Sequence, residues 1–235
     1  MRTKTLLIAA AALAAGVLAS SATTYSLNIV GYINQVLPAG ANTLICNQLQ
    51  TTNATASAEA VLPALQVGDS LLIWDAGIGN YDTYTYVGGG STGWVQPDGM
   101  TMGGPPNISL GQGFYYYTGS LSQETNTFVG TVITNGIVSL PAGANTLVGS
   151  IAPIAATADS TNMALPLQVG DSLLLWDAGI GNYDTYTYVG GGSTGWVQPD
   201  GATMGGPPTI QVGQGFYYYT GSLSAETWTQ NIQVN

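Results

Sequence analysis

The sequence predicts an all-β protein made of two tandem, near-identical β-sandwich or open-barrel units of about 100 residues, each with at most one short helix. The main observation is an internal repeat, because residues 65–125 align without gaps onto residues 167–227 with only six differences. The second is a series of short runs rich in β-branched and aromatic residues, separated by Gly-rich turns. Strands at such short spacing are typical of sandwiches and barrels.

The first segment of the chain has the pattern of a secretory signal. Arg2 and Lys4 form a positive start, residues 6–18 form an apolar core, and small residues follow at 20–22. We therefore expect a signal peptide over 1–22, the first β unit over 23–134 and the second over 135–235. No later apolar run approaches the roughly 20 residues of a membrane helix, so the mature chain is expected to have no membrane span and to be extracellular or at the cell surface.

The elements of the first unit follow from local composition. A strand is expected over 25–33, an apolar strand at 44–46, and a short helix in the Ala-rich stretch 54–62. Residues 70–74 and 81–87 are expected to be strands joined by the Gly-rich reversal 75–80.

Later elements repeat this scheme. Residues 113–118, with sequence GFYYYT, predict a further strand. The second unit has a weaker helix signal at 160–164, and the chain ends on a strand-like segment at 228–234. Between the units, Asn135-Gly136 stands between two apolar runs and predicts a hairpin that pairs the last strand of unit 1 with the first strand of unit 2.

Charge excludes several classes of function. The chain has two Lys+Arg, which are Arg2 and Lys4, no His, and twelve Asp+Glu. Once the signal is removed, no cation remains to neutralise phosphate, which excludes nucleic acid and anionic membrane surfaces as partners. The chain also lacks the residues that a Ser–His triad or a zinc site requires, so no enzyme activity is expected.

Only carboxylate chemistry remains as a remote alternative, a carboxylate-based hydrolase. Asp75-Ala76-Gly77 and its repeat at 177–179 faintly resemble the paired Asp loops of aspartic proteases, but Ala replaces the usual hydroxyl residue. A glycosidase would need two carboxyl groups roughly 5–10 Å apart, and the sequence alone does not bring any two together.

No cofactor is expected, with calcium as the one candidate. Oxygen-bearing side chains cluster in the reversal after each SLLIW or SLLLW strand, and calcium prefers such ligands. A hairpin turn explains the same residues. The weak calcium candidates are Asp75, Asn80, Asp82, Asp177, Asn182 and Asp184.

Cys46 is the only cysteine, so no disulfide can form within the chain. It stands in an apolar strand, which favours a small buried side chain over a reactive thiol. Its counterpart in the second unit is Gly149.

Aromatic residues suggest a two-site carbohydrate-binding module, the alternative function. In 113–118 successive side chains alternate, so one Tyr pair faces away from its own core unless both faces of the strand are covered. Core packing and subunit contact explain the same residues. The candidates for stacking on sugars are Trp94, Trp196, Tyr115, Tyr117, Tyr217 and Tyr219.

The ends of the chain suggest the leading function, an exported structural or adhesive protein that associates with copies of itself. The first strand has no predecessor and the last has no successor, so the two ends of different molecules are expected to pair into extracellular fibres. These ends folding back onto their own sheets is the alternative. The candidate self-association residues are Tyr25, Leu27, Ile29, Trp228, Ile232 and Val234.

The order of four motifs resembles a group of exported bacterial β-repeat proteins of unknown function. The motifs are PAGANTL at 38–44, VGDSLLIW at 67–74, GQGFYYY at 111–117 and TFVG at 127–130. The resemblance spans both units and implies export and β structure, but supplies no catalytic or binding residues.

Overall fold

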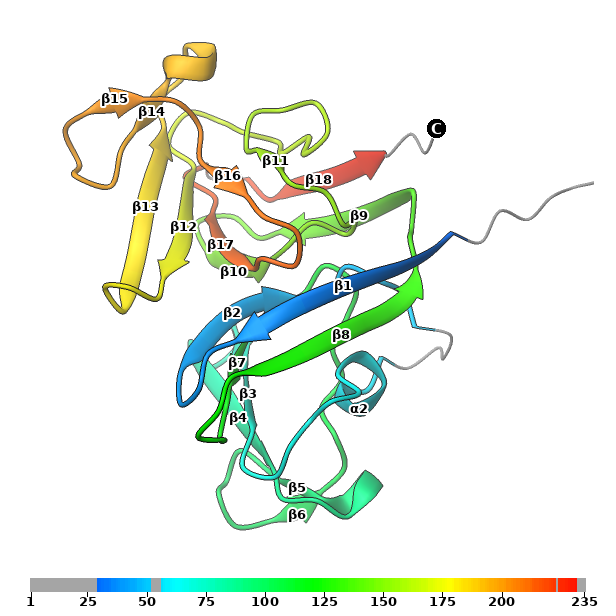
Figure 1. Ribbon diagram of the computed structural model, residues 1–235. Coiled ribbons are helices and arrows are strands. Elements are labelled where there is room, and N and C mark those ends of the chain that lie inside the picture. Colours follow the sequence, from blue (N-terminus) through cyan, green and yellow to red (C-terminus); the bar gives the residue numbers. More distant parts are fainter. Residues whose placement is uncertain (1–28, 52–55, 223, 232–235) are drawn as a thin grey trace, which may run out of the picture.

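The computed structural model of the chain describes residues 29–51, 56–222 and 224–231 (Figure 1). The protein is nearly all β, with 45% of residues in strands and 4% in helices, and two similar units account for most of the strands. The all-β prediction is therefore confirmed. The predicted signal segment, residues 1–22, lies outside the described residues.

Each unit contains one six-stranded antiparallel sheet. Equivalent strands occupy equivalent places in the two sheets, as the repeat predicts. The first sheet has the order β2 (Asn42–Cys46), β7 (Gly113–Tyr117), β3 (Ser70–Asp75), β4 (Asn80–Tyr86), β5 (Trp94–Val95) and β6 (Met102–Gly103). The second has the order β10 (Asn145–Val148), β17 (Phe216–Tyr219), β12 (Ser172–Asp177), β13 (Asn182–Tyr188), β14 (Trp196–Val197) and β15 (Met204–Gly205).

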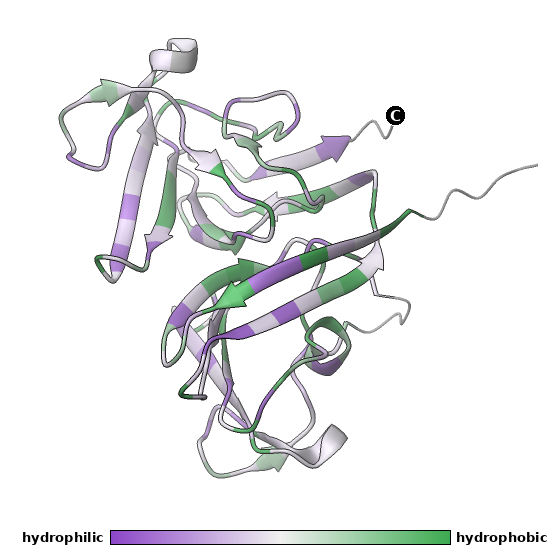
Figure 2. Ribbon diagram, viewed as in Figure 1, coloured by the Kyte–Doolittle hydropathy of each residue, from purple (hydrophilic) through white to green (hydrophobic). Residues whose placement is uncertain are grey.

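A two-stranded ribbon covers one face of each sheet. In unit 1 it consists of β1 (Val30–Leu37) and β8 (Glu124–Thr131), and in unit 2 of β9 (Asn135–Leu140) and β18 (Glu226–Asn231). Figure 2 shows both apolar and polar residues in β1 and β8, and more exposed residues alternate with more buried ones along each strand. The apolar face of the first ribbon packs Leu37 and Phe128 against Phe114 and Tyr116 of the sheet. Each unit is thus a two-layer sandwich with its own core.

Helical structure is scarce, as expected. The helix α2 (Ala58–Val61) begins after Ser57, whose hydroxyl accepts a hydrogen bond from the Ala60 amide over 3.4 Å. In unit 2 the predicted stretch 160–164 forms turns instead of a helix. The remaining short elements are two 3₁₀ turns, η1 (Gly90–Thr92) and η2 (Gly192–Thr194), and a small ribbon of β11 (Ala156–Thr157) and β16 (Thr209–Ile210).

The predicted reversal between 75 and 80 is confirmed. Strands β3 and β4 pair in register up to Asp75 and Asn80. The carboxylate of Asp75 accepts the amide of Gly77 over 2.7 Å, and Gly79 has a φ of 64°. Asp and Gly are therefore explained by the turn itself, since Asp caps turn amides and Gly adopts left-handed backbone readily.

The predicted hairpin at Asn135-Gly136 is wrong. Both residues lie inside β9, where they pair with Asn231 and Gln230 of β18, and neither has the positive φ that a type I′ turn requires. A Cβ on Gly136 would lie 2.4 Å from Cδ1 of Ile151, so a larger residue there would require that side chain to shift. The two units are joined by residues 132–134 without direct pairing of β8 to β9.

The expectation that the chain ends lack partners is also wrong for the described residues. Strand β1 begins at Val30 and pairs with β8, while β18 pairs with β9, so both fold back onto their own units. Trp228 is completely buried and donates its Nε1 hydrogen to the carbonyl of Met163 over 2.7 Å, so it cannot contact another molecule. Ile29 accepts the Val132 amide over 2.8 Å. Tyr25, Leu27, Ile232 and Val234 lie outside the described residues.

Candidate functional site: an aromatic cleft between the units

The two units contact each other through equivalent segments, which gives the chain an internal pseudo-two-fold symmetry. The Cys46 amide donates to the carbonyl of Gly213 over 2.9 Å. At the equivalent place, the Gly149 amide donates to the carbonyl of Gly111 over the same 2.9 Å. Each unit's second strand therefore bonds to the loop before the aromatic strand of the other unit.

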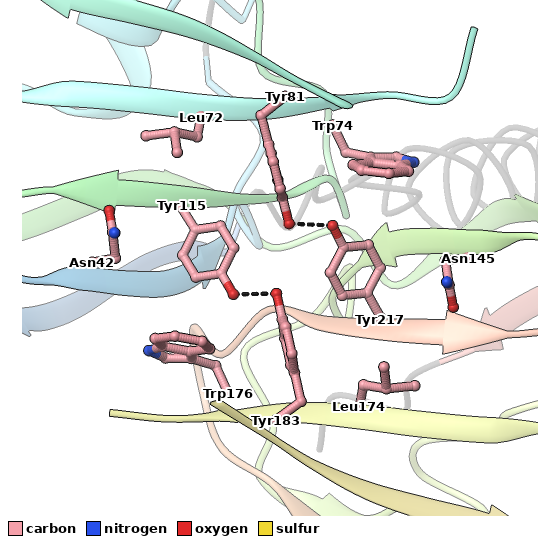
Figure 3. Close-up of a pocket in the computed structure, with 10 residues that line it drawn as sticks. All are labelled: Asn42, Leu72, Trp74, Tyr81, Tyr115, Asn145, Leu174, Trp176, Tyr183 and Tyr217. Atoms are coloured by element: carbon pink, nitrogen blue, oxygen red, sulfur yellow. Dashed lines mark hydrogen bonds between the residues drawn. The ribbon is translucent and has the colours of Figure 1, made fainter. Parts of the chain in front are cut away.

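A cleft of about 460 Å³ lies at this interface (Figure 3). It is formed by the sheet faces that the ribbons do not cover, and each unit contributes the same five residues. The lining residues are Asn42, Leu72, Trp74, Tyr81 and Tyr115 from unit 1, and Asn145, Leu174, Trp176, Tyr183 and Tyr217 from unit 2.

Four tyrosines join the units at the centre of the cleft. The hydroxyl of Tyr81 is hydrogen-bonded to that of Tyr217, and the hydroxyl of Tyr115 to that of Tyr183. Within each unit the rings are also close, since Tyr81 and Tyr115 have ring centroids 5.6 Å apart in an edge-to-face arrangement. Such pairs are favourable beyond the area they bury, so the tyrosines form a preorganised framework.

Two tryptophans flank this framework. The ring of Trp74 lies 5.8 Å from that of Tyr217 at 90°, and the ring of Trp176 lies 5.4 Å from that of Tyr115 at 86°. Both tryptophans are half-buried. Their Nε1 atoms are buried and have no hydrogen-bond partner among the described residues, so each indole carries an unused donor.

The cleft carries no charge of its own. Burial, reinforced by the hydrogen bond to the partner tyrosine, raises the pKa of Tyr115 and of Tyr217 well above the ordinary value of 10.0. These phenols therefore stay neutral at any physiological pH. The remaining polar groups are the exposed amides of Asn42 and Asn145 at the rim. The site offers aromatic surface, neutral hydroxyls and amides.

Of the predicted sugar-stacking residues, only Tyr115 and Tyr217 lie in the cleft. Tyr117 and Tyr219 are partly exposed but do not line it. The prediction for Trp94 and Trp196 is wrong, because both side chains are completely buried in the cores of their units. The ring of Trp94 packs 5.2 Å from Tyr86, and its Nε1 donates to Glu59 over 3.2 Å.

The alternation of side chains along residues 113–118 did contain a usable signal. Phe114 and Tyr116 face the core of their own unit, while Tyr115 is only 5% exposed because the other unit covers it. Both faces of this strand are therefore covered, one by its own unit and the other by the neighbouring unit. Trp74, Trp176, Tyr81 and Tyr183 were missed, because their convergence depends on how the two sheets face each other.

The calcium candidates do not form a cluster of acidic groups. Among the described residues, no three His, Cys, Asp or Glu side chains converge as metal ligands do. Asp75 and Asp177 each cap their own hairpin turn, through Gly77 and Gly179 over 2.7 Å. Calcium binding at these loops remains a prediction.

A second group of polar residues is enclosed in each core. The hydroxyl of Tyr116 donates to Asp69 and lies 3.4 Å from an oxygen of Glu124, and the arrangement repeats at Asp171, Tyr218 and Glu226. Asp69 is fully buried and Glu124 is 7% exposed. The fold thus brings two carboxyl groups together, as glycosidases do, but their burial leaves no access for a substrate.

Comparison with known proteins gives no match to a family model, to a curated protein or to a solved structure. Among the described residues, no helix has the length and apolarity that crossing a membrane requires.

Proposed function

We propose that the protein is an exported binding protein without enzyme activity, and that its aromatic cleft holds a neutral carbohydrate. The observation that carries this proposal is the composition of the cleft: six aromatic rings, two amides, two leucines and no ionised group, around about 460 Å³. Ligand sites commonly have volumes of roughly 300–1,000 Å³ and combine apolar surface with a few polar groups.

A sugar ring matches these features in chemical type. Its C–H faces pack on aromatic rings, and its hydroxyls exchange hydrogen bonds with phenols and amides. The half-buried rings of Trp74 and Trp176 offer such a ligand aromatic surface, whereas their buried Nε1 atoms do not face it. Anionic glycans are disfavoured, because the chain beyond Lys4 carries carboxylates and no cations.

We propose one site in place of the two expected from the sequence. Trp94 and Trp196, on which the two-site reading depended, are buried, whereas both units contribute equally to the single cleft. A ligand in the cleft therefore contacts both units and stabilises their association, because binding to the folded state alone raises stability.

The test is a glycan array with neutral and acidic glycans, followed by variants. Trp176→Ala is expected to weaken binding of the best neutral glycan by at least about tenfold, as loss of an aromatic anchor does. Asn42→Ala combined with Asn145→Ala should also weaken binding while leaving the packed rings intact, since both amides are exposed. Tyr32→Ala, at an exposed tyrosine outside the cleft, is the control.

Failure would be clear in either part of this test. If the protein binds no neutral glycan on the array, a neutral carbohydrate is not its ligand. Unchanged binding by a folded Trp176→Ala variant would place the ligand elsewhere.

A second candidate function is the structural or adhesive one, with head-to-tail association of copies. It is supported by the one-sided pairing of the end strands: in the described part of the chain, β1 pairs only with β8 and β18 only with β9. The outer face of the first ribbon exposes Val30, Tyr32, Val36 and Val129. An unpaired edge beside an apolar face is suited to strand addition by another copy.

A further inference from the structure

The aromatic strand of each unit continues beyond the cleft, and its next tyrosine on the same face is left uncovered. Tyr115 and Tyr117 lie two residues apart on β7, so their side chains share one face of the sheet. The neighbouring unit covers Tyr115, which is 5% exposed, whereas Tyr117 is 37% exposed. The second unit repeats this arrangement, with Tyr217 6% and Tyr219 36% exposed. In both units an accessible ring therefore follows the buried one.

The strand register places these accessible rings at the two ends of the cleft. Tyr117 is the pairing partner of Asn42, and Tyr219 is the partner of Asn145. Figure 3 shows the two asparagines at opposite ends of the cleft, with the four tyrosines between them. Two residues along a strand span about 7 Å, so each outer ring lies close enough to the cleft for one ligand to contact both.

The side chains that neighbour each outer tyrosine on this face are uncharged. In unit 1 they include Ser70, which is a pairing partner of Tyr117, and Thr83 and Thr85 of β4. The hydroxyls of Ser70 and Thr85 are hydrogen-bonded over 2.8 Å, and Thr83 is exposed. Unit 2 keeps the same hydroxyl pair, over 2.9 Å. The surface beyond each end of the cleft thus offers a ring, an amide and hydroxyls, the same kinds of group that line the cleft itself.

We infer that the ligand is an extended, linear chain of neutral sugars that reaches from Tyr117 to Tyr219, and that these two tyrosines are its outer binding residues. This inference rests on the proposed function of the cleft. A monosaccharide cannot contact both ends of the cleft at once. A linear chain can do so, and it meets aromatic surface and neutral hydrogen-bonding groups along its whole length.

The pseudo-two-fold symmetry makes the two ends of this binding surface equivalent. Each end presents a tyrosine, an asparagine and a pair of hydroxyls from the same positions of the repeat. What one end binds, the other end can also bind, so a chain built from one repeating sugar satisfies both. Substitutions of Tyr117 and of Tyr219 should therefore have equal effects, although the two residues belong to different units.

The test measures affinity against ligand length by isothermal titration calorimetry. The probes are the cello-, xylo-, manno- and malto-oligosaccharides, from the monosaccharide to the hexasaccharide. Affinity for the series that binds should rise beyond the disaccharide, because only a longer chain reaches the outer rings.

Variants assign this gain to the outer tyrosines. Tyr117→Ala and Tyr219→Ala should each weaken hexasaccharide binding by about two- to tenfold, the range of one aromatic contact, and leave disaccharide binding unchanged. Unchanged disaccharide binding also shows that the variants fold. The two losses should multiply in the combined variant, because the residues lie at opposite ends of the cleft. Tyr32→Ala, at an exposed tyrosine outside the cleft, is the control.

Failure of this inference is distinguishable from failure of the proposed function. If affinity does not rise beyond the disaccharide, or if both variants bind the hexasaccharide as tightly as wild type, the outer tyrosines are not binding residues, even where Trp176→Ala still weakens binding. If only branched or other glycans bind on the array and none of the linear series does, the extended chain is overturned. If no neutral glycan binds at all, the proposed function fails and this inference fails with it.

Discussion

At the scale of single residues, the buried carboxyl groups have hydrogen-bond partners other than cationic side chains. The only cationic side chains of the chain are Arg2 and Lys4. Asp171 accepts the amides of Gln168 and Gly221 over 2.7 and 2.9 Å, and Tyr218 lies between it and Glu226. Backbone amides and a phenol replace the salt bridges that other proteins use. Burial, and then the nearby charge of Asp171, raises the pKa of Glu226 above its ordinary value of 4.5.

This shift predicts that Glu226→Gln stabilises the protein at neutral pH. A carboxyl group with a raised pKa in the folded state binds its proton more tightly there than in the unfolded state. Its stabilising contribution is therefore fully present below the ordinary value of 4.5 and is lost as pH rises through the raised pKa. Thermal unfolding should show a higher Tm for Glu226→Gln than for wild type at pH 7 and little difference at pH 4.

The control for this experiment is Asp159→Asn, at an exposed carboxylate. It should leave the pH dependence of Tm unchanged. A lower Tm of Glu226→Gln at pH 7 would show that the ionised group stabilises the fold, which contradicts this prediction.

Residue-scale expectations succeeded where the local sequence determines the environment. Cys46 is buried and free, as its apolar strand predicted, and burial raises the pKa of its thiol. Trp94 was misjudged because its Gly-rich surroundings suggested a loop. Gly88 and Gly89, both with positive φ, fold the chain back so that Trp94 pairs with Tyr86 and enters the core. Burial of this kind depends on tertiary packing and cannot be read from composition.

At the scale of elements, the strands themselves were predictable but their partners were not. The runs at 70–74, 81–87 and 113–118 correspond to β3, β4 and β7 within one or two residues. Pairing of β1 with β8 joins segments that are far apart in the sequence, and no turn signal marks it. Asn135-Gly136 carried a strong turn signal, yet both residues pair with β18, far along the chain.

The end strands give a prediction about assembly. Charges on the exposed face of the first ribbon, in the variant Tyr32→Glu with Val129→Glu, should abolish association through that edge, because charged side chains on exposed strands block strand addition and these add to the repulsion between acidic copies. Static light scattering and negative-stain microscopy of the concentrated protein measure this, with added salt to screen the repulsion between acidic molecules. Ile78→Glu, at an exposed hairpin tip, is the matched control.

Two results would reject this route of association. If the wild-type protein stays monodisperse at high concentration and high salt, it does not form fibres through its edge strands. Fibres that persist unchanged in the doubly substituted protein use another surface.

At the scale of the whole molecule, duplication has produced a site that neither unit has alone. Each sheet has one face covered by its own ribbon and the other covered by the neighbouring unit, where Tyr115 and Tyr217 meet the rings of the opposite sheet. The repeat was evident from the sequence, so two similar units were predictable. Their face-to-face packing was not, because a repeat specifies equal units without specifying the symmetry that relates them.

The symmetry also explains one difference between the two units. Equivalent residues normally occupy separate places, so they can stay identical, as the cleft residues do. At the axis the equivalent positions compete for one place, and there Cys46 faces Gly149. The difference between Cys46 and Gly149 cannot be interpreted from the sequence alone, but the packing of the two units requires it.

Isothermal titration calorimetry with the neutral oligosaccharide that binds most tightly on the array tests the central claim. This claim is that both units jointly form a single site. The account predicts one ligand bound per chain, and loss of that binding in both Trp74→Ala and Trp176→Ala, although these residues belong to different units. Two ligands per chain, with each substitution removing only one of them, would contradict it.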